Sequence, residues 1–396
     1  MPWKETRVTD ERMMFVAEYL EDESTMSALC RRYGISRKTG YKWVGRYERE
    51  GPGGLEDRSR APHRHPNGIA EDVKGLIVEM RKKHEKWGPK KLRAKLAQKH
   101  PGRGHWPAHS SIGALLKREG MIPERALRNK AKPSPTPLTE TQRGNHVWCA
   151  DFKGRFRTGD GRWCEPLTIT DNHTRFLLRC DHVARTGLAC VQPLFEAAFR
   201  EFGLPELIRT DNGSPFASHG LGGLSKLSVW WIQLGITPEH IEPGKPQQNG
   251  RHERMHRTLA EETASPPAHN ACAQQIRFDR FRHEYNYERP HEALDMQHPG
   301  ALYAGSPRPY PDSIEDFEYD RWYLVRKVQS RGEIHVNGRR IFISEAFYGQ
   351  RIALQEIEGD LCRIWFHDFE LGLLALQNGK VVPHPCLLKK EANFKD

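Results

Sequence analysis

Long hydrophobic runs are missing from this 396-residue chain, and its mean hydropathy is −0.76. A helix needs roughly 20 consecutive apolar residues to cross a bilayer, and no stretch of the sequence meets that requirement. The first residues, Met1–Arg7, also lack the apolar core of a signal peptide. These absences argue against a membrane-spanning or secreted protein. We therefore expect a cytoplasmic chain with no membrane partner.

Closely spaced cysteine pairs are missing as well. The eight cysteines are scattered, and no Cys-x-x-Cys motif occurs. This excludes the usual cysteine-based zinc modules and gives no sign of a disulfide framework. Reduced and mostly buried thiols are the expectation, as in intracellular proteins.

Negative charge is scarce in the first third of the chain. Residues 1–140 hold 30 Lys+Arg against 18 Asp+Glu, whereas the remaining residues hold 32 against 33, so the net charge of +11 is not evenly spread. A solvated basic surface would explain the excess without any function. A segregated basic region more often marks binding to a polyanion, and DNA is the leading candidate.

Residues 1–66 have the pattern of a helix-turn-helix domain. Apolar residues predict helices at 10–22 and 26–33, and Gly34-Ile35 supplies a turn. Ser36 is a suitable N-cap for a basic helix over 37–47. Its first turns would face the bases, which makes DNA-contact candidates of Arg37, Lys38, Tyr41 and Lys42. Gly40 and Gly45 are expected to weaken this helix by roughly 1 kcal/mol each.

Residues 67–128 predict a second helical module of the same kind. Apolar spacing indicates helices near 73–80, 89–98 and 110–118, and the module resembles a helix-turn-helix with a possible wing. A proline-rich segment, Lys130–Leu138, predicts an extended linker within residues 129–145. Two tandem modules would suit a DNA site of about two helical turns.

Beyond residue 145 the pattern changes to strands alternating with helices. Strands are predicted at 146–152, 165–170, 175–179, 206–209 and 236–241, with helices at 187–202 and 248–262. This pattern predicts a mixed sheet covered by helices. Three carboxylates stand out: Asp151 within a strand, Asp211 directly after one, and Glu253 at the start of a helix. If they converge, they repel each other unless a hard divalent cation is bound, and Mg²⁺ fits oxygen ligands best.

Residues 146–300 resemble the catalytic core of insertion-sequence transposases in the retroviral-integrase superfamily. The resemblance rests on Trp148-Cys-Ala-Asp-Phe-Lys-Gly154, on Arg209-Thr-Asp-Asn-Gly-Ser-Pro-Phe216, on Pro246 to Leu259 and on Tyr285 to Leu294, in this order. It implies a ribonuclease-H-like fold in which Asp151, Asp211 and Glu253 hold two Mg²⁺ ions, or Mn²⁺. It further implies DNA cleavage and strand transfer without a covalent protein–DNA intermediate.

The resemblance has one departure, because 41 residues separate Asp211 from Glu253, more than is typical of retroviral members. The extra length is expected in residues 220–232. Around the triad, the predicted second-shell or DNA-backbone contacts are Asn212, Asn249, His256 and Arg257, the last three of which share the helical face of Glu253.

The same residues permit other interpretations. His252-Glu-Arg-Met-His256 matches the zinc-peptidase motif His-Glu-x-x-His, in which both histidines would bind Zn²⁺ and Glu253 would act as a base. That interpretation leaves Asp151, Asp211 and the basic N-terminal third unexplained. A DNA-binding regulator that descends from a transposase and has lost catalysis is a further alternative.

The last part of the sequence predicts a small β domain. Residues 301–325 are rich in loop formers and form a connector, and residues 326–390 contain short strands around Asn337-Gly338, Gly359-Asp360 and Asn378-Gly379. Five short strands predict an SH3-like barrel, which resembles the C-terminal domain of the same family.

The chain is therefore expected to be multidomain, with all-α modules, an α/β core and a β-barrel. We expect a bacterial, nucleoid-associated transposase that binds terminal inverted repeats and target DNA. Joining two DNA ends in one complex implies a homo-oligomer, at least a dimer.

Overall fold

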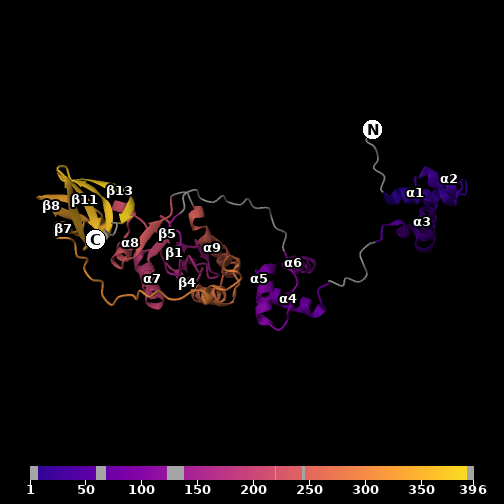
Figure 1. Ribbon diagram of the computed structural model, residues 1–396, viewed down its shortest axis with the longest axis horizontal. Helices are drawn as coiled ribbons and strands as arrows, with labels where there is room; N and C mark the ends of the chain where they lie inside the picture. Colours follow the sequence, from indigo (N-terminus) through magenta and orange to yellow (C-terminus); the bar gives the residue numbers. More distant parts are fainter. Residues whose placement is uncertain (1–7, 59–67, 123–137, 219, 243–245, 390–396) are drawn as a thin grey trace, which may run out of the picture. The chain divides into compact units, whose positions relative to one another are not determined.

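The computed structural model describes residues 8–58, 68–122, 138–218, 220–242 and 246–389 (Figure 1). The chain divides into two compact units, Met1–Ile69 and Ala70–Asp396, and each is described by itself. Most of the predicted linker 129–145, including the proline-rich segment up to residue 137, lies outside the described residues.

The first unit contains three helices: α1 (Val8–Leu20), α2 (Met26–Arg32) and α3 (Arg37–Glu50). The predicted N-cap is confirmed, because the hydroxyl of Ser36 accepts the backbone N–H of Thr39 at 3.2 Å. Gly40 is buried, and a Cβ at this position would lie 2.7 Å from Cys30 Sγ and 2.9 Å from Phe15 Cζ. The glycine therefore allows α3 to approach α1 and α2 closely.

The second unit begins with three further helices: α4 (Glu71–Lys83), α5 (Pro89–Lys99) and α6 (His109–Arg118). Their inward residues are those that the apolar spacing indicates, among them Ile77, Leu92 and Ile112. The described residues between 68 and 122 include no strand, so the structure describes no wing there.

The central domain is built on a mixed six-stranded sheet. Its strands are β1 (Val147–Phe152), β2 (Phe156–Arg157), β3 (Trp163–Asp171), β4 (Leu177–Val183), β5 (Leu207–Thr210) and β6 (Thr237–His240). The order is β2-β3-β1-β5-β6, with β4 also paired to β3. Strand β1 is antiparallel to β3 and parallel to β5, and β5 is parallel to β6. This is the mixed sheet that the sequence predicts.

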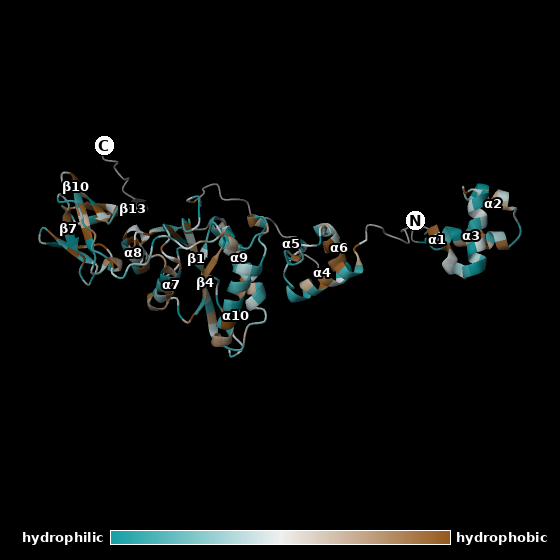
Figure 2. Ribbon diagram, turned by 60° about the horizontal axis from the view of Figure 1, so that its bottom comes forward, coloured by the Kyte–Doolittle hydropathy of each residue, from teal (hydrophilic) through white to brown (hydrophobic). Residues whose placement is uncertain are grey.

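Helices cover both faces of this sheet. Helices α7 (Leu188–Phe202) and α8 (Lys226–Gln233) share one core with Trp148, Ala150 and Ile208. On the other face, α9 (Gly250–Thr263) and α10 (Ala271–His283) pack on Leu177 and Cys180. In Figure 2 most of α9 has hydrophilic colouring, whereas strand β4 mixes apolar Leu177, Leu178 and Val183 with polar residues. Successive residues of a strand alternate between the two cores.

The predicted strand at 175–179 begins too early. Strand β4 starts at Leu177, because Arg175 adopts a positive φ of 67° in the turn after β3. Helices α8 and α10 were not predicted. Helix α8 begins at Lys226, within the segment 220–232 where the extra length before Glu253 was expected, and its residues are almost all buried.

The outer edge of β4 is paired by side chains rather than by another strand. Asn286 accepts the N–H of Leu177 at 2.8 Å and donates to its carbonyl at 2.9 Å. Gln275 of α10 accepts the N–H of His182 at 2.8 Å and donates to the carbonyl of Cys180 at 3.0 Å. These amides replace the backbone partners that an edge strand otherwise lacks.

The C-terminal domain is an antiparallel β domain. A five-stranded sheet has the order β13-β12-β11-β10-β7, and β8 (Glu333–Val336) and β9 (Arg339–Phe342) form a separate hairpin. The sheet strands are β7 (Leu324–Lys327), β10 (Arg351–Glu358), β11 (Leu361–Phe366), β12 (Phe369–Ala375) and β13 (Lys380–Lys389). Asn337 and Gly338 both have positive φ, as a type I′ turn requires. The described pairings do not close the sheet into a barrel, so the SH3-like closure stays a prediction.

Short helical turns complete the described structure: η1 (Gly51–Leu55), η2 (Leu221–Gly223), η3 (Pro246–Asn249), η4 (Glu284–Glu288), η5 (Glu292–Leu294), η6 (Pro299–Ala301) and η7 (Glu345–Phe347). None of the described helices combines the length and the apolar content that crossing a membrane requires.

Candidate active site

Two of the three carboxylates meet at the carboxyl end of the parallel strands. The β1–β5 register pairs Cys149 with Arg209, so Asp151 and Asp211 lie two residues further along neighbouring chains. Adjacent strands are about 4.8 Å apart. Both aspartates also occupy the face opposite to Trp148 and Ile208, which belong to the core under α7 and α8. Strand alternation therefore directs them to the α9 side of the sheet.

The third carboxylate reaches the same face from helix α9. Met255 and Leu259 are buried against the sheet, whereas Glu253, two residues before Met255, is exposed in the first turn of the helix. Asp151 is partly buried in the middle of this arrangement. The three carboxylates thus come from strand β1, the turn after strand β5 and helix α9.

The electrostatics of Asp151 reflect this arrangement. Burial, followed by the negative charge of Asp211 and, more weakly, of Glu253, raises the pKa of Asp151 to about 7. An ordinary aspartate has a pKa near 3.9, and both burial and neighbouring negative charge disfavour its ionised form. Asp211 and Glu253 therefore both lie within electrostatic reach of Asp151. Lys153 opposes this shift, but its positive charge does not outweigh burial and the neighbouring carboxylates.

A cluster of hydroxyl and imidazole groups lies directly beside Asp151. Thr168 pairs with Asp151 across the β1–β3 register, and its hydroxyl donates to the Asp151 carbonyl at 3.2 Å. The same hydroxyl contacts Nε2 of His252 at 2.7 Å and Nε2 of His256 at 2.6 Å. The hydroxyl of Thr170 contacts His252 Nδ1 at 2.9 Å.

Both histidines are buried, and burial lowers the pKa of His252 to about 3. Burial and the neighbouring His252 and Lys153 also lower the pKa of His256 far below its ordinary value, so both rings are neutral at physiological pH. Among the described residues, Asp151, His252 and His256 each offer one potential metal-ligand atom within 4.8 Å of the others. However, three of the four ring nitrogens already contact threonine hydroxyls. This favours a packing role for the His-Glu-x-x-His motif over the peptidase interpretation.

Hydrogen bonds within the turn after β5, and from it to the end of β6, hold the turn that carries Asp211. The carboxylate of Asp211 accepts the N–H of Gly213 at 3.1 Å, and a Cβ on Gly213 would lie 3.1 Å from Asp211 Oδ2. The predicted contact residue Asn212 is exposed, and its amide donates to the carbonyl of Ile241 at 2.6 Å. His240, which was not predicted, contacts the Asp211 carbonyl through Nδ1 at 3.3 Å. These contacts connect the turn to the end of β6.

The other predicted residues differ in exposure. Asn249 is buried at the start of α9. His256 Nδ1 lies 3.7 Å from Asp151 Oδ2, and Arg257 is exposed one turn after Glu253. In the first unit, the candidate DNA contacts on α3 are all exposed: Arg37, Lys38, Tyr41 and Lys42.

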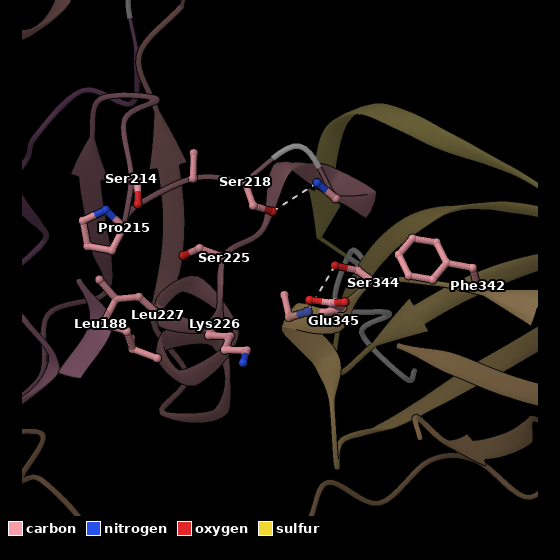
Figure 3. A pocket seen from close by; sticks show the side chains of 13 residues that line it. Leu188, Ser214, Pro215, Ser218, Ser225, Lys226, Leu227, Phe342, Ser344 and Glu345 are labelled. Atoms are coloured by element: carbon pink, nitrogen blue, oxygen red, sulfur yellow. Dashed lines mark hydrogen bonds between the residues drawn. The ribbon is translucent and has the colours of Figure 1, made fainter. Parts of the chain in front are cut away.

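A cavity of about 510 Å³ lies close to the Asp211 turn. Figure 3 shows Ser214 and Pro215 on one side of it, and Phe342, Ser344 and Glu345 on the other. Its lining is mainly apolar side chains and small hydroxyls, with Lys226 and Glu345 as the charged groups. This lining offers no group of carboxylates or imidazoles that resembles the Asp151 site.

The motif Tyr285–Leu294 has a structural role in this arrangement. Asn286 pairs with the edge of β4. Arg289 forms a two-pronged ion pair with Glu262 of α9, at 2.6 and 3.0 Å, and both side chains are largely buried. Charge-assisted pairs of this geometry fix orientation. The motif therefore connects the helix that carries Glu253 to the rest of the core.

Comparison with protein-family models agrees with this domain order. A helix-turn-helix domain matches residues 11–63, and a homeodomain-like domain matches residues 39–116. Two models of integrase core domains match residues 141–246 and 234–299. The C-terminal domain of IS481 family transposases matches residues 323–381.

Similar curated proteins come from insertion elements. The insertion element IS407 uncharacterized 31.7 kDa protein of Burkholderia multivorans is 27% identical over 60% of this chain and 83% of its own length. The insertion element IS476 uncharacterized 39.2 kDa protein of Xanthomonas euvesicatoria is 28% identical over 60% of this chain and 67% of its own length.

Solved structures with similarity include two viral proteins. A chain of the simian T-cell lymphotropic virus intasome in complex with PP2A regulatory subunit B56 gamma is 13% identical, covers 79% of this chain and 98% of its own, and has a TM-score of 0.37. The HTLV-2 integrase catalytic core domain in complex with magnesium is 13% identical, covers 41% and 99%, and has a TM-score of 0.32.

The matched segments follow one another in the order of the domains, from the helix-turn-helix modules through the integrase core to the transposase C-terminal domain. The insertion-element relatives span the greater part of the chain. Together, these matches support an insertion-sequence transposase with an integrase-type core.

Proposed function

We propose that this transposase binds the terminal inverted repeats of its element through the N-terminal helical modules and cleaves and joins DNA strands at Asp151, Asp211 and Glu253. One observation carries the proposal: Asp211 and Glu253, from elements far apart in sequence, both raise the pKa of Asp151. A carboxylate whose pKa is raised by neighbouring carboxylates is typical of a functional site.

The donor set fits a hard divalent cation. Carboxylate oxygens are the ligands that Mg²⁺ prefers, and Mn²⁺ accepts the same set. Asp151, Asp211 and Glu253 would hold the metal, as two ions in the proposed form. When bound, such ions activate the attacking oxygen and stabilise the leaving oxygen of a phosphodiester. The metal would also relieve the repulsion that raises the Asp151 pKa.

The surrounding residues would bind and orient the DNA. Arg257 is exposed one turn after Glu253, and Lys153 lies near enough to Asp151 to affect its pKa. Both cations could contact DNA phosphates beside the carboxylates. Exposed Arg37, Lys38, Tyr41 and Lys42 on α3 would read bases in the repeat. Because one DNA complex must hold two ends, at least two copies of the chain would assemble on it.

The test is strand cleavage and transfer on labelled element ends with Mg²⁺. Replacing Asp211→Asn should reduce both activities by at least about a hundredfold, because it removes a metal-binding charge while the turn can still form. Binding to the ends should persist. The matched control is Asp316→Asn, at a side chain that is 77% exposed in the connector, and it should leave activity unchanged.

Undiminished activity in Asp211→Asn would refute the proposed site. End-specific binding by a wild-type protein that shows no cleavage with Mg²⁺ or Mn²⁺ would instead favour the regulator that has lost catalysis.

A further inference from the structure

Thr168, His252 and His256 form a cluster beside the proposed metal site. None of the three is a proposed metal ligand. The cluster connects strand β3 to the first turns of α9, the helix that carries Glu253. All three side chains are buried, with Thr168 0% and His252 2% exposed. The cluster is thus part of the interior contact between helix and sheet, and it lies immediately behind Asp151.

One assignment of protons satisfies every contact in this cluster. The Thr168 hydroxyl donates to the Asp151 carbonyl at 3.2 Å. Its two lone pairs then accept the Nε2–H groups of His252 and His256, at 2.7 and 2.6 Å. Thr170 donates to Nδ1 of His252 at 2.9 Å. A hydroxyl has one proton and two lone pairs, so Thr168 uses its full capacity.

This assignment leaves Nδ1 of His256 as an unprotonated nitrogen that faces Asp151 Oδ2 at 3.7 Å. The backbone carbonyl of Asp151 therefore contacts the cluster directly, and the carboxylate of Asp151 lies close to it. Glu253 follows His252 directly in the chain. The hydroxyl of Thr168 thus connects the backbone of Asp151 to the helical turn that carries Glu253.

We propose that Thr168 is a positioning residue, which sets the placement of Glu253 relative to Asp151 by binding His252 and His256 simultaneously. This inference rests on the proposed metal-dependent function of the same carboxylates. Residues behind metal ligands orient them, and their loss commonly lowers metal affinity or activity about 10- to 100-fold. The alternative, a metal ion held by Asp151 and the two imidazoles themselves, is an outcome of the test.

The primary experiment compares Thr168→Val with Thr168→Ser in the full chain, with cleavage of labelled ends measured as a function of Mg²⁺ concentration. Valine keeps the shape but removes the hydroxyl, so half-maximal cleavage should require at least about tenfold more Mg²⁺, while DNA affinity stays unchanged. Serine keeps the hydroxyl and should restore the wild-type Mg²⁺ dependence. A Thr168→Val enzyme with wild-type Mg²⁺ dependence would overturn the proposal.

The matched control is Thr263→Val, on helix α9. Thr263 is also buried, but its hydroxyl donates within α9, to the carbonyl of Leu259 at 2.7 Å. Removing it should not change the Mg²⁺ dependence. A tenfold shift in this control would show that loss of a buried hydroxyl elsewhere, at α9, has the same effect, which would contradict a specific role for Thr168.

A second pair of variants covers the case in which Thr168→Val does not fold. In His256→Gln the amide nitrogen can take the place of Nε2 and donate to Thr168, whereas in His256→Asn it takes the place of Nδ1 beside Asp151. Positioning through Thr168 requires the glutamine variant to be the more active one. Higher activity of the asparagine variant would refute it and favour a metal bound through Nδ1.

Hydrogen exchange separates failure of this inference from failure of the proposed function. In the protein without DNA, the amides of the first turns of α9 should exchange at least about tenfold faster in Thr168→Val than in Thr168→Ser. If the wild-type protein does not cleave but this difference is found, the proposed function fails and the positioning contact stands. Equal exchange would overturn the contact. Tight Zn²⁺ binding that disappears in His256→Ala but persists in Thr168→Val would assign the cluster to a metal instead.

Discussion

At the scale of single residues, Asp151 and Asp171 show two opposite environments for an aspartate. Asp151 has negative neighbours, and burial with their charge raises its pKa to about 7. Asp171 is fully buried, yet it accepts the backbone N–H groups of Asn145 and Thr174, each at 2.7 Å, and the Thr174 hydroxyl at 2.7 Å. Donors that satisfy a carboxylate stabilise its charged form, whereas burial beside like charges destabilises it.

Asp151→Asn should therefore stabilise the metal-free protein at pH 8, by on the order of 1–3 kcal/mol in the free energy of unfolding. The pKa of Asp151 is higher in the folded state than in the unfolded state. The wild-type protein therefore has its full stability, as far as this carboxyl is concerned, below about pH 4, and loses part of it as the pH rises through 7. The gain should accordingly shrink as the pH is lowered. Chemical denaturation at several pH values measures it, and added Mg²⁺ should stabilise the wild type more than the variant.

Asp171→Asn serves as the contrasting substitution. The amide keeps an acceptor but places an N–H group among donors, so we expect a loss of about 2–4 kcal/mol at pH 8. If both variants change the free energy of unfolding in the same direction, the proposed difference between the environments of Asp151 and Asp171 would be wrong.

At the scale of elements, apolar periodicity predicted those helices and strands whose pattern is regular. Helix α10 was missed because Gln274 takes an inward position that an apolar residue normally occupies, where its amide donates to the Thr263 carbonyl and accepts from Ala268. Helix α8 was missed because it is buried nearly all round and has no polar face to reveal a period. Local motifs were enough to propose the three carboxylates, whereas the contacts of Thr168 were not predictable, because its histidine partners lie 84 and 88 residues away.

Helix α3 offers a matched pair of glycines on one element. A Cβ on Gly40 would meet Cys30, Met26 and Phe15 at 2.7 to 2.9 Å, whereas one on Gly45 would meet nothing within 4 Å. Gly40→Ala should therefore destabilise α1–α3 by about 1–3 kcal/mol through overpacking. Gly45→Ala should stabilise them by about 0.5–1 kcal/mol through helix propensity. Hydrogen exchange of these helices in the full chain measures both, and equal effects would contradict the packing argument.

At the scale of the whole molecule, the excess positive charge is carried by a segment shorter than the N-terminal third. Residues 1–69 hold 13 Lys+Arg and 11 Asp+Glu, whereas residues 70–140 hold 17 and 7. The first helical unit is thus nearly balanced, and the segment with α4–α6 carries most of the excess. Phosphate contacts determine salt-dependent affinity, and base contacts determine sequence selectivity. The two properties should therefore reside in different modules.

Removing residues 1–69 should reduce discrimination between element ends and unrelated DNA, while most of the salt dependence of binding remains. Removing residues 1–137 should abolish both. Fluorescence anisotropy at several salt concentrations gives the slope of log Kd against log salt, to which each phosphate contact contributes about 0.9. If the shorter deletion removes most of the slope, the assignment of charge and selectivity to separate modules is incorrect.

The side-chain amides along β4 also limit how copies of the protein can assemble. With Asn286 and Gln275 bonded to the backbone of Leu177, Cys180 and His182, a strand from a second copy would have to displace these side chains to continue the sheet there. An exposed edge invites such continuation and the fibrous growth that follows from it. In the proposed complex with two DNA ends, the copies would therefore meet on other surfaces, and the sheet would end at β4 on this side.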